Sequence, residues 1–156
     1  RVAKKRKFSV AVAGFPEMHP DSPNRESDIR YLKEKVDAGA DVIITQLFFD
    51  NQHFFEYLEH VRKAGISIPV IPGLLPILSV SQVQRFTTLS KSKIPSHVQN
   101  ELEKHRDDDK AATQYGIELT THQCEGLMKA GVPGLHFYAL NKSYSVQTVL
   151  KNLGLV

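Results

Sequence analysis

Two kinds of segment alternate along the chain. Short apolar runs rich in β-branched residues predict strands, and longer segments with apolar residues at helical spacing predict helices. Strands are predicted at residues 8–13, 42–48, 68–71 and 134–138. Helices are predicted at residues 27–38, 52–64, 80–90, 111–130 and 146–153. Because the strand runs are nearly continuously apolar, the sequence predicts a parallel sheet that is buried on both faces.

A short glycine motif recurs where a helix should end and a strand should begin. It reads DAGADV, KAGISI and KAGVPG, with the glycines at Gly39, Gly65 and Gly131. Glycine readily adopts the left-handed conformation that ends many helices, so each motif is interpreted as a helix stop. The repetition indicates a repeated αβ unit. The polar stretch 91–110 lies between the second and third motifs and is interpreted as an insertion in one unit.

Four βα units fit two architectures. One is a small doubly wound domain, and the other is half of a (β/α)8 barrel, which takes ~250 residues when complete. The chain begins abruptly at Arg1, which favours the half-barrel. We therefore predict an α/β fold that is part of a parallel (β/α)8 TIM barrel, although a half-barrel leaves two open sheet edges.

Composition and charge fit one globular domain, with 41% hydrophobic residues in a chain of 156. Five of the first seven residues are basic, and residues 1–7 are interpreted as a solvated lead-in rather than a localisation signal. The rest of the chain has no basic stripe, so no nucleic-acid partner is expected. No apolar run approaches the ~18–20 residues of a membrane span, so no membrane partner is expected either.

The single cysteine, Cys124, leaves no intrachain disulfide and fits a reducing, cytoplasmic compartment. It sits at helical spacing between Ile117 and Leu127, which indicates a core residue rather than a catalytic thiol. No HExxH motif or Cys/His cluster has ligand spacing, so no metal site is expected. His53 and His60 are expected to be exposed on one helix face.

Unusual polar residues gather where the predicted strands end, and ligands of parallel α/β folds bind at that end. The first strand leads into AGFPEMHPDSPNRESD, which has more proline, histidine and charged residues than a short strand-to-helix connection needs. Gln46 lies late in the second strand, where its amide can both donate and accept, although backbone groups could also satisfy it. Asp28 and Lys35 share a helix face beside the loop, which favours an anionic ligand over a plain cap and a solvated lysine.

The common nucleotide and nucleophile motifs GxGxxG, GxxxxGK[ST] and GxSxG are absent from the sequence. A nucleotide would therefore bind by a route other than the Rossmann loop. In the fourth strand, His136 alternates with Leu135 and Phe137 and is expected to face the same side as Tyr138. An interior histidine and a site residue are both compatible with that placement.

Four segments together resemble the methylenetetrahydrofolate reductase family, and most closely its eukaryotic form. They are AVAGFPEMHPDS, DIRYLKEKVDAGADVIITQLFFD, IPVIPGLLPI and VPGLHFYALN. The resemblance implies that residues 1–156 form the C-terminal half of a single TIM-barrel catalytic domain, about the last four βα units. It implies a flavoprotein oxidoreductase of one-carbon metabolism and methionine biosynthesis. Such an enzyme uses FAD and NAD(P)H to reduce 5,10-methylenetetrahydrofolate to 5-methyltetrahydrofolate, and a homo-oligomer is expected for the full-length protein.

The resemblance also implies roles for individual residues. The implied cofactor contacts are Phe15, His19, Pro20, Asp21, Ser22, Asp28 and Lys35. The implied contacts to the folate or nicotinamide are Gln46, Gln82, Phe86, Tyr138 and Lys142. No catalytic residue is secure here, because the acidic proton donor of the family is expected in the N-terminal half.

Two positions depart from the family pattern. Phe15 stands where the family often has tyrosine, so a hydroxyl contact is lost while ring packing survives. Lys142 stands where the family commonly has arginine, and lysine cannot form the bidentate fork with a carboxylate. Two alternatives remain open: a non-catalytic flavin- or folate-binding half-barrel that needs its other half, and an aldolase-type barrel fragment with a Schiff base on Lys35 or Lys142. The second is disfavoured because neither lysine lies in an apolar strand.

Overall fold

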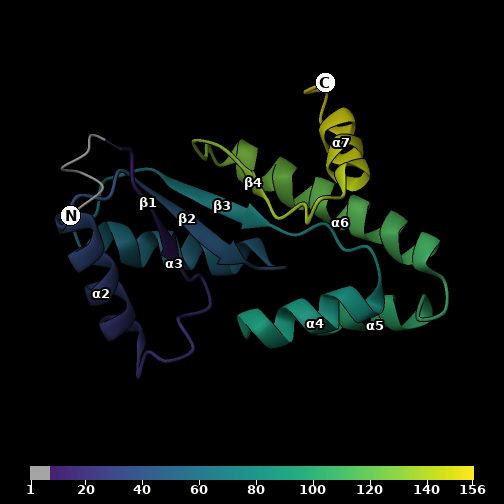
Figure 1. The fold of residues 1–156 in the computed structure, drawn as a ribbon, viewed down its shortest axis with the longest axis horizontal. Helices are drawn as coiled ribbons and strands as arrows, with labels where there is room; N and C mark the ends of the chain where they lie inside the picture. Colours follow the sequence, from purple (N-terminus) through teal and green to yellow (C-terminus); the bar gives the residue numbers. More distant parts are fainter. Residues whose placement is uncertain (1–7) are drawn as a thin grey trace.

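The structure is a computed structural model that describes residues 8–156, so the lead-in predicted at residues 1–7 lies outside the described residues. Figure 1 shows the order of its elements. They are β1 (Ala11–Gly14), α2 (Arg25–Asp37), β2 (Val42–Leu47), α3 (Asn51–Lys63), β3 (Val70–Leu74), α4 (Val80–Ser90), α5 (Ser96–Lys104), α6 (Asp109–Lys129), β4 (His136–Phe137) and α7 (Ser143–Asn152). Every predicted strand and helix is present with ends that move by a few residues, and α5 is an additional helix.

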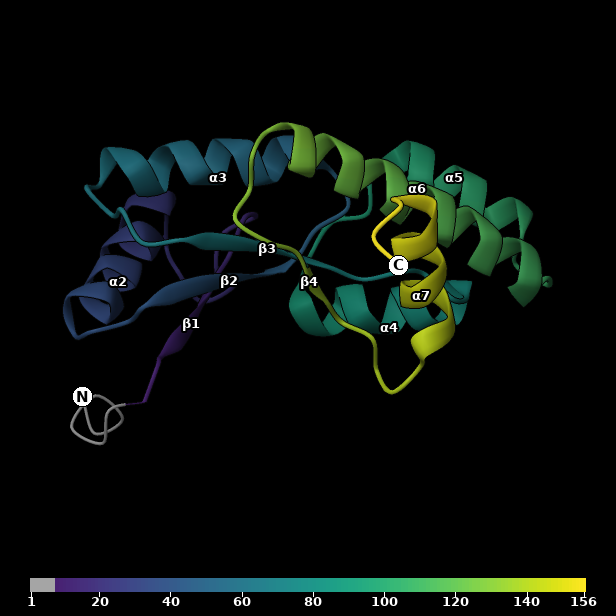
Figure 2. The ribbon, with the colours of Figure 1, turned by 90° about the horizontal axis from the view of Figure 1, so that it is seen from above.

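The strands form one four-stranded parallel sheet in the order β1-β2-β3-β4. In a doubly wound sheet the strand order reverses at a switch point, whereas here each strand pairs with the one before it. Crossovers of one hand in such a sequential sheet bring connecting helices to the same side. Figure 2 shows α3 and α6 together on one side of the sheet, whereas α4 lies on the other. The predicted parallel α/β class is confirmed, and the arrangement is consistent with four consecutive units of a (β/α)8 barrel.

Polar side chains begin four of the helices in residues 8–156 by accepting backbone N–H groups of the first turn. Asn24 caps α2, Asp50 caps α3, Ser79 caps α4 and Asp108 caps α6. Short polar side chains at this position satisfy donors that have no partner inside the helix. The first of these caps corrects the sequence prediction, in which this helix started at residue 27. The helix begins earlier because Asn24 supplies the cap, and Asp28 is thereby left for other contacts.

Glycines end the helices that precede β2, β3 and β4, as predicted. The φ angles are 108° at Gly39, 74° at Gly65 and 76° at Gly131. A side chain at these angles would strain the backbone, so glycine lets the chain turn from each helix into the next strand. The repeated motif therefore correctly predicts where the helix of each αβ unit ends.

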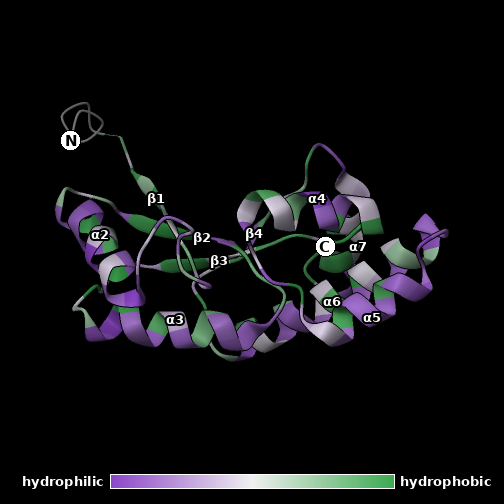
Figure 3. Cartoon of the chain, turned by 90° about the horizontal axis from the view of Figure 1, so that it is seen from below, coloured by the Kyte–Doolittle hydropathy of each residue, from purple (hydrophilic) through white to green (hydrophobic). Residues whose placement is uncertain are grey.

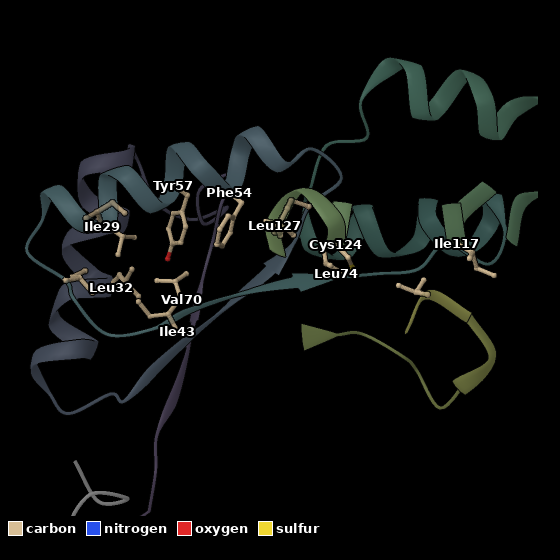
Figure 4. Packing of buried hydrophobic residues seen from close by; sticks show 14 residues of the cluster. Ile29, Leu32, Ile43, Phe54, Tyr57, Val70, Leu74, Ile117, Cys124 and Leu127 are labelled. Carbon is tan, nitrogen blue, oxygen red and sulfur yellow. The ribbon is translucent and has the colours of Figure 1, made fainter. Parts of the chain in front are cut away.

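The main core lies between the sheet and the helices on its covered side. Figure 4 shows Ile43 and Val70 from the strands beside Phe54 and Tyr57 of α3, with Cys124 farther along on α6. The Cys124 side chain is fully buried, which confirms it as a core residue, and burial raises the pKa of its thiol to about 12. This core fixes the sheet on which the site is built.

The two faces of β2 differ in burial, which corrects the prediction that both are covered. Residues 43, 45 and 47 are buried, whereas Val42, Ile44 and Gln46 are only half-buried. The reason is the one-sided placement of α3 and α6, which leaves the second face only partly covered in residues 8–156. Figure 3 shows that the strands are nevertheless mostly apolar. The sequence therefore reported the apolar character of both faces but not their exposure.

The polar stretch 91–110 contains regular secondary structure and does not only interrupt the alternation of strands and helices. It contains α5, whose Val98 and Leu102 are buried in a second cluster with Leu47 and Ile77. The four-residue spacing of Val98 and Leu102 places them on one helix face, and this spacing was the available signal. None of the helices in residues 8–156 has both the length and the apolar character to cross a membrane. The same residues hold no cluster of three or more candidate metal ligands.

Candidate cofactor and substrate site

The connection from β1 to α2 folds back on itself in two tight turns. Met18 N donates to Phe15 O at 2.9 Å, and Ser22 N donates to His19 O at 3.0 Å. The His19 ring accepts from Asp21 N at 3.1 Å and packs edge-on against the Phe15 ring, with centroids 4.5 Å apart. Met18 takes a φ of 76°, which is uncommon for a residue with a side chain. Phe15 and His19 are therefore held together as one half-buried surface.

Arg25, in the first turn of α2, holds this loop by hydrogen bonds to its backbone. Its guanidinium donates to Phe15 O at 2.9 Å and to Pro16 O at 2.6 Å, and it lies 3.5 Å from an Asp28 carboxylate oxygen. Carbonyl oxygens at a turn need donors when they are partly buried, and a planar guanidinium can serve two at once. Sequence reasoning missed Arg25, because its two shortest hydrogen bonds go to backbone oxygens, which leave no side-chain motif.

Gly14 lets the loop leave β1 close to α3. A Cβ on Gly14 would collide with the Tyr57 hydroxyl and come within 2.8 Å of the Ile43 side chain. In Figure 4 the Tyr57 hydroxyl points from α3 toward the strands. This hydroxyl is buried without a hydrogen-bond partner in residues 8–156, and burial raises its pKa above the usual value. The absence of a side chain at Gly14 thus makes room for the tyrosine under the loop.

The loop and α2 enclose a hollow of about 570 Å³ at the carboxyl end of β1. It is lined by Phe15, His19, Asp21, Ser22, Asp28, Tyr31, Glu34, Lys35 and Ala38. All the predicted cofactor residues except Pro20 are brought together here, and Pro20 is exposed on the loop. Tyr31, Glu34 and Ala38 were not predicted. Their helical spacing from Asp28 and Lys35 could have identified them, because side chains three and four residues apart share a face.

Charge in the hollow comes from the carboxylates of Asp21, Asp28 and Glu34 and from the ammonium group of Lys35. Asp28 is 8% exposed, and Ser22 Oγ donates to its carboxylate at 3.4 Å. Lys35 Nζ donates to Ala13 O at 2.8 Å. Partial burial lowers the pKa of Lys35, and the carboxylate of Asp28 acts in the opposite direction. The hollow therefore offers a cation for an anionic group, a buried acceptor for a hydroxyl, and the Phe15 ring for a flat apolar surface.

Gln46 lies on the other side of the loop, at the end of β2. Its side-chain oxygen accepts from Leu47 N at 2.9 Å, as in the backbone-satisfied alternative considered from the sequence. Its amide nitrogen makes no hydrogen bond in residues 8–156 and can donate to a ligand. Gln46 lines a narrow cavity with Phe15 and Glu17, so Phe15 borders both this cavity and the hollow.

The predicted contacts at the carboxyl ends of β3 and β4 meet in a second narrow cavity. Gln82, Tyr138 and Lys142 line it together with Pro76 and Ser145. The Gln82 side chain accepts from Leu78 N at 2.7 Å, and Tyr138 OH donates to Thr45 O at 2.9 Å. Burial raises the pKa of Tyr138, so its hydroxyl stays protonated and can donate at neutral pH.

The remaining residues considered from the sequence are Phe86 and three of the histidines. Phe86 is half-buried against the second apolar cluster and borders neither narrow cavity, so its contact with an aromatic ligand stays a prediction. The rings of His136 and Tyr138 meet edge-on at 4.9 Å, which confirms that both side chains face the same side. His60 is exposed as predicted, whereas His53 is half-buried. The expectation that His53 is exposed is wrong because Glu17 of the loop lies 3.6 Å from its Nδ1.

Known proteins resemble this chain over nearly its whole length. The family model described as "Methylenetetrahydrofolate reductase" matches residues 2–154. The curated methylenetetrahydrofolate reductase (NADH) 1 of Zea mays is 41% identical over 96% of this chain and 27% of its own length. A probable methylenetetrahydrofolate reductase (NADPH) of Caenorhabditis elegans is 40% identical over 95% of this chain and 22% of its own length. The 5,10-methylenetetrahydrofolate reductase of Escherichia coli is 32% identical over 94% of this chain and 50% of its own length.

A solved structure gives the same result for the fold. An uncharacterized protein from Clostridium thermocellum, described as binding two copies of 5-methyl-5,6,7,8-tetrahydrofolic acid, superposes with a TM-score of 0.68. It is 16% identical, and the match covers 96% of this chain and 54% of that one. This chain thus spans about a quarter to a half of the relatives it matches. On the match of the family model to nearly all of its residues, the chain belongs to the methylenetetrahydrofolate reductase family.

Proposed function

We propose that this chain supplies one wall of the active site of an FAD-dependent methylenetetrahydrofolate reductase. The reaction is the reduction of 5,10-methylenetetrahydrofolate to 5-methyltetrahydrofolate with NADH or NADPH. The observation that carries the proposal is the convergence of Phe15, His19, Asp28 and Lys35 on one hollow at the carboxyl end of β1. The names of the curated relatives include both nicotinamide donors.

The residues of the hollow fit part of a flavin nucleotide. Its volume of about 570 Å³ lies within the usual range of ligand pockets, ~300–1,000 Å³. Lys35 would hold a negative charge, and the buried Asp28 would accept a hydrogen bond from a hydroxyl. Phe15 and His19 would pack against the flat part of the molecule. FAD, when bound, supplies the capacity to take up a hydride and pass it on.

Residues near the other strand ends would bind and orient the substrate. The free amide nitrogen of Gln46 suits an acceptor on the edge of a pterin ring. The hydroxyl of Tyr138 is already engaged with Thr45 O, so Tyr138 would shape the cavity rather than exchange a proton. Lys142 is exposed at the start of α7, where its ammonium can attract a carboxylate as a point charge.

The domain organisation follows from the same proposal. Residues 1–156 would form the C-terminal half of one barrel domain, with 91–110 as an insertion that forms α5 and packs at the carboxyl ends of the strands. The acidic group that protonates the folate would come from the N-terminal half. The remaining residues of this chain would then serve binding and orientation rather than proton transfer.

The experiment uses the full-length protein and a matched pair of lysine variants. Wild type should purify yellow or take up added FAD, and it should oxidise NADH or NADPH with a quinone acceptor. Lys35→Gln should raise the FAD dissociation constant at least about tenfold, the effect of losing a charge-assisted hydrogen bond. Lys33→Gln should leave it unchanged, because Lys33 pairs with Asp37 away from the hollow. A wild-type protein that binds no added FAD would overturn the proposal.

A further inference from the structure

Glu17 lies inside the cofactor loop and contacts two other parts of the chain. Its side chain is only 11% exposed. One carboxylate oxygen accepts from Lys93 N at 2.7 Å, in the segment between α4 and α5. The other lies 3.6 Å from Nδ1 of His53, in the first turn of α3. A single carboxylate thus joins three segments that are far apart in the sequence.

The contact between Glu17 and His53 involves two buried side-chain atoms. Neither the Glu17 oxygen nor His53 Nδ1 has a hydrogen-bond partner in residues 8–156. A buried carboxylate oxygen without a partner is costly, and His53 Nδ1 is the polar atom of α3 that lies beside it. The loop is therefore held to α3 by this polar contact and to residue 93 by a hydrogen bond.

The segment that receives Glu17 borders the substrate side of the site. Lys91 turns the chain with a φ of 54°, and the buried Ser92 hydroxyl donates to Leu47 O at 2.9 Å. Residues 90–92, together with Gln46, line the same narrow cavity as Glu17. This segment directly follows α4, which carries Gln82 and Phe86. Glu17 consequently connects the cofactor hollow with the helix of predicted substrate contacts.

We propose that Glu17 is a positioning residue, which holds the cofactor loop in its binding shape by anchoring it to the amide of Lys93 and to His53. The inference rests on the proposed function for its cofactor and goes beyond it in naming a residue that does not line the hollow. Removal of the anchor should free the loop and the segment after α4 together. Phe15 and His19 would then no longer be held at one wall of the hollow.

The test compares three variants of the full-length protein. Glu17→Ala should raise the FAD dissociation constant about tenfold, the size expected from losing a hydrogen bond with a charged acceptor. It should also speed hydrogen exchange at the Lys93 amide of the FAD-free protein. Glu17→Gln keeps an oxygen that accepts from Lys93 N and a polar atom beside His53 Nδ1, so it should restore most of the affinity. Glu26→Gln is the charge-matched control on the exposed side of α2.

The outcomes separate this inference from the proposed function. Wild type that binds FAD, with Glu17→Ala weakened and Glu17→Gln close to wild type, supports the anchor. Equal FAD affinity and equal Lys93 exchange in wild type and Glu17→Ala would overturn it while leaving the proposed function in place. Failure of every protein, wild type included, to bind FAD would remove the proposed function, and the positioning role would fall with it. Faster exchange at Lys93 would then show only that Glu17 holds this segment.

Discussion

The ammonium of Lys35 donates to the carbonyl oxygen of Ala13 over 2.8 Å, so a side chain of α2 is fastened to the end of β1. This bond holds a cation at the mouth of the hollow. Partial burial lowers the pKa of Lys35, and the nearby carboxylate of Asp28 acts in the opposite direction. The position of the charge, rather than its presence alone, is what the structure adds to the sequence.

A pH dependence of cofactor binding follows from this placement. The cationic form of Lys35 attracts an anionic ligand, and its lowered pKa means that this form is lost at a pH below the ordinary value of 10.5. We therefore expect the FAD affinity of wild type to fall as the pH rises into the alkaline range. The measurement is flavin binding at a series of pH values. Lys35→Gln should lack this fall, and an identical decline in both proteins would contradict the assignment.

Replacement of Arg25 should loosen the cofactor loop. Arg25→Ala removes the donors for Phe15 O and Pro16 O and leaves these carbonyls short of partners. The expected loss is about 1.5–3 kcal/mol in the free energy of unfolding, the usual range for hydrogen bonds to a charged group. Urea unfolding measures it, with Arg85→Ala as the control at an exposed position of α4. Equal losses in the two variants would contradict a specific role for Arg25.

The close approach of Gly14 and Tyr57 can be tested by a double-mutant cycle. Gly14→Ala should destabilise the fold by about 1–3 kcal/mol, as expected for overpacking. Tyr57→Phe should be nearly neutral, because the hydroxyl it removes is buried without a partner. The double variant should recover part of the loss, while the Ile43 side chain keeps the remainder. Strict additivity of the two changes would show that Tyr57 does not limit the space at Gly14.

The thiol of Cys124 should be inert in the folded protein. Its burial raises the pKa to about 12, so the reactive thiolate is scarce at pH 8 and reagents have no access. The protonated thiol favours the folded state below pH 9, and this contribution is lost as the pH rises toward the folded value. A thiol reagent at pH 8 should therefore react slowly before denaturant is added and fully afterwards. Rapid reaction of native protein would place Cys124 outside the core.

Sequence patterns predicted the parallel fold and most of the hollow for physical reasons that can be named. The apolar runs and the glycines at the helix ends reflect local chemistry, so they can be recognised in the sequence without knowing any tertiary contact. The residue pair Asp28 and Lys35 was found because a helix places such spacings on one face. Arg25 and Glu17 were not found, because their partners include backbone atoms of remote segments. The exposure of Ile44 depends on which side the helices take, and the apolar runs do not record that choice.

The sequential order of the sheet has a consequence for how the chain reaches its fold. Since each strand pairs with the one made just before it, every pairing closes a loop of only one unit. Contacts close in sequence form faster than distant ones, because less chain entropy is lost in bringing them together. The first three strands can thus assemble in the order of synthesis. The step to β4 spans α4, α5 and α6, which makes the docking of the last strand the slowest closure and the one that finishes the substrate side of the site.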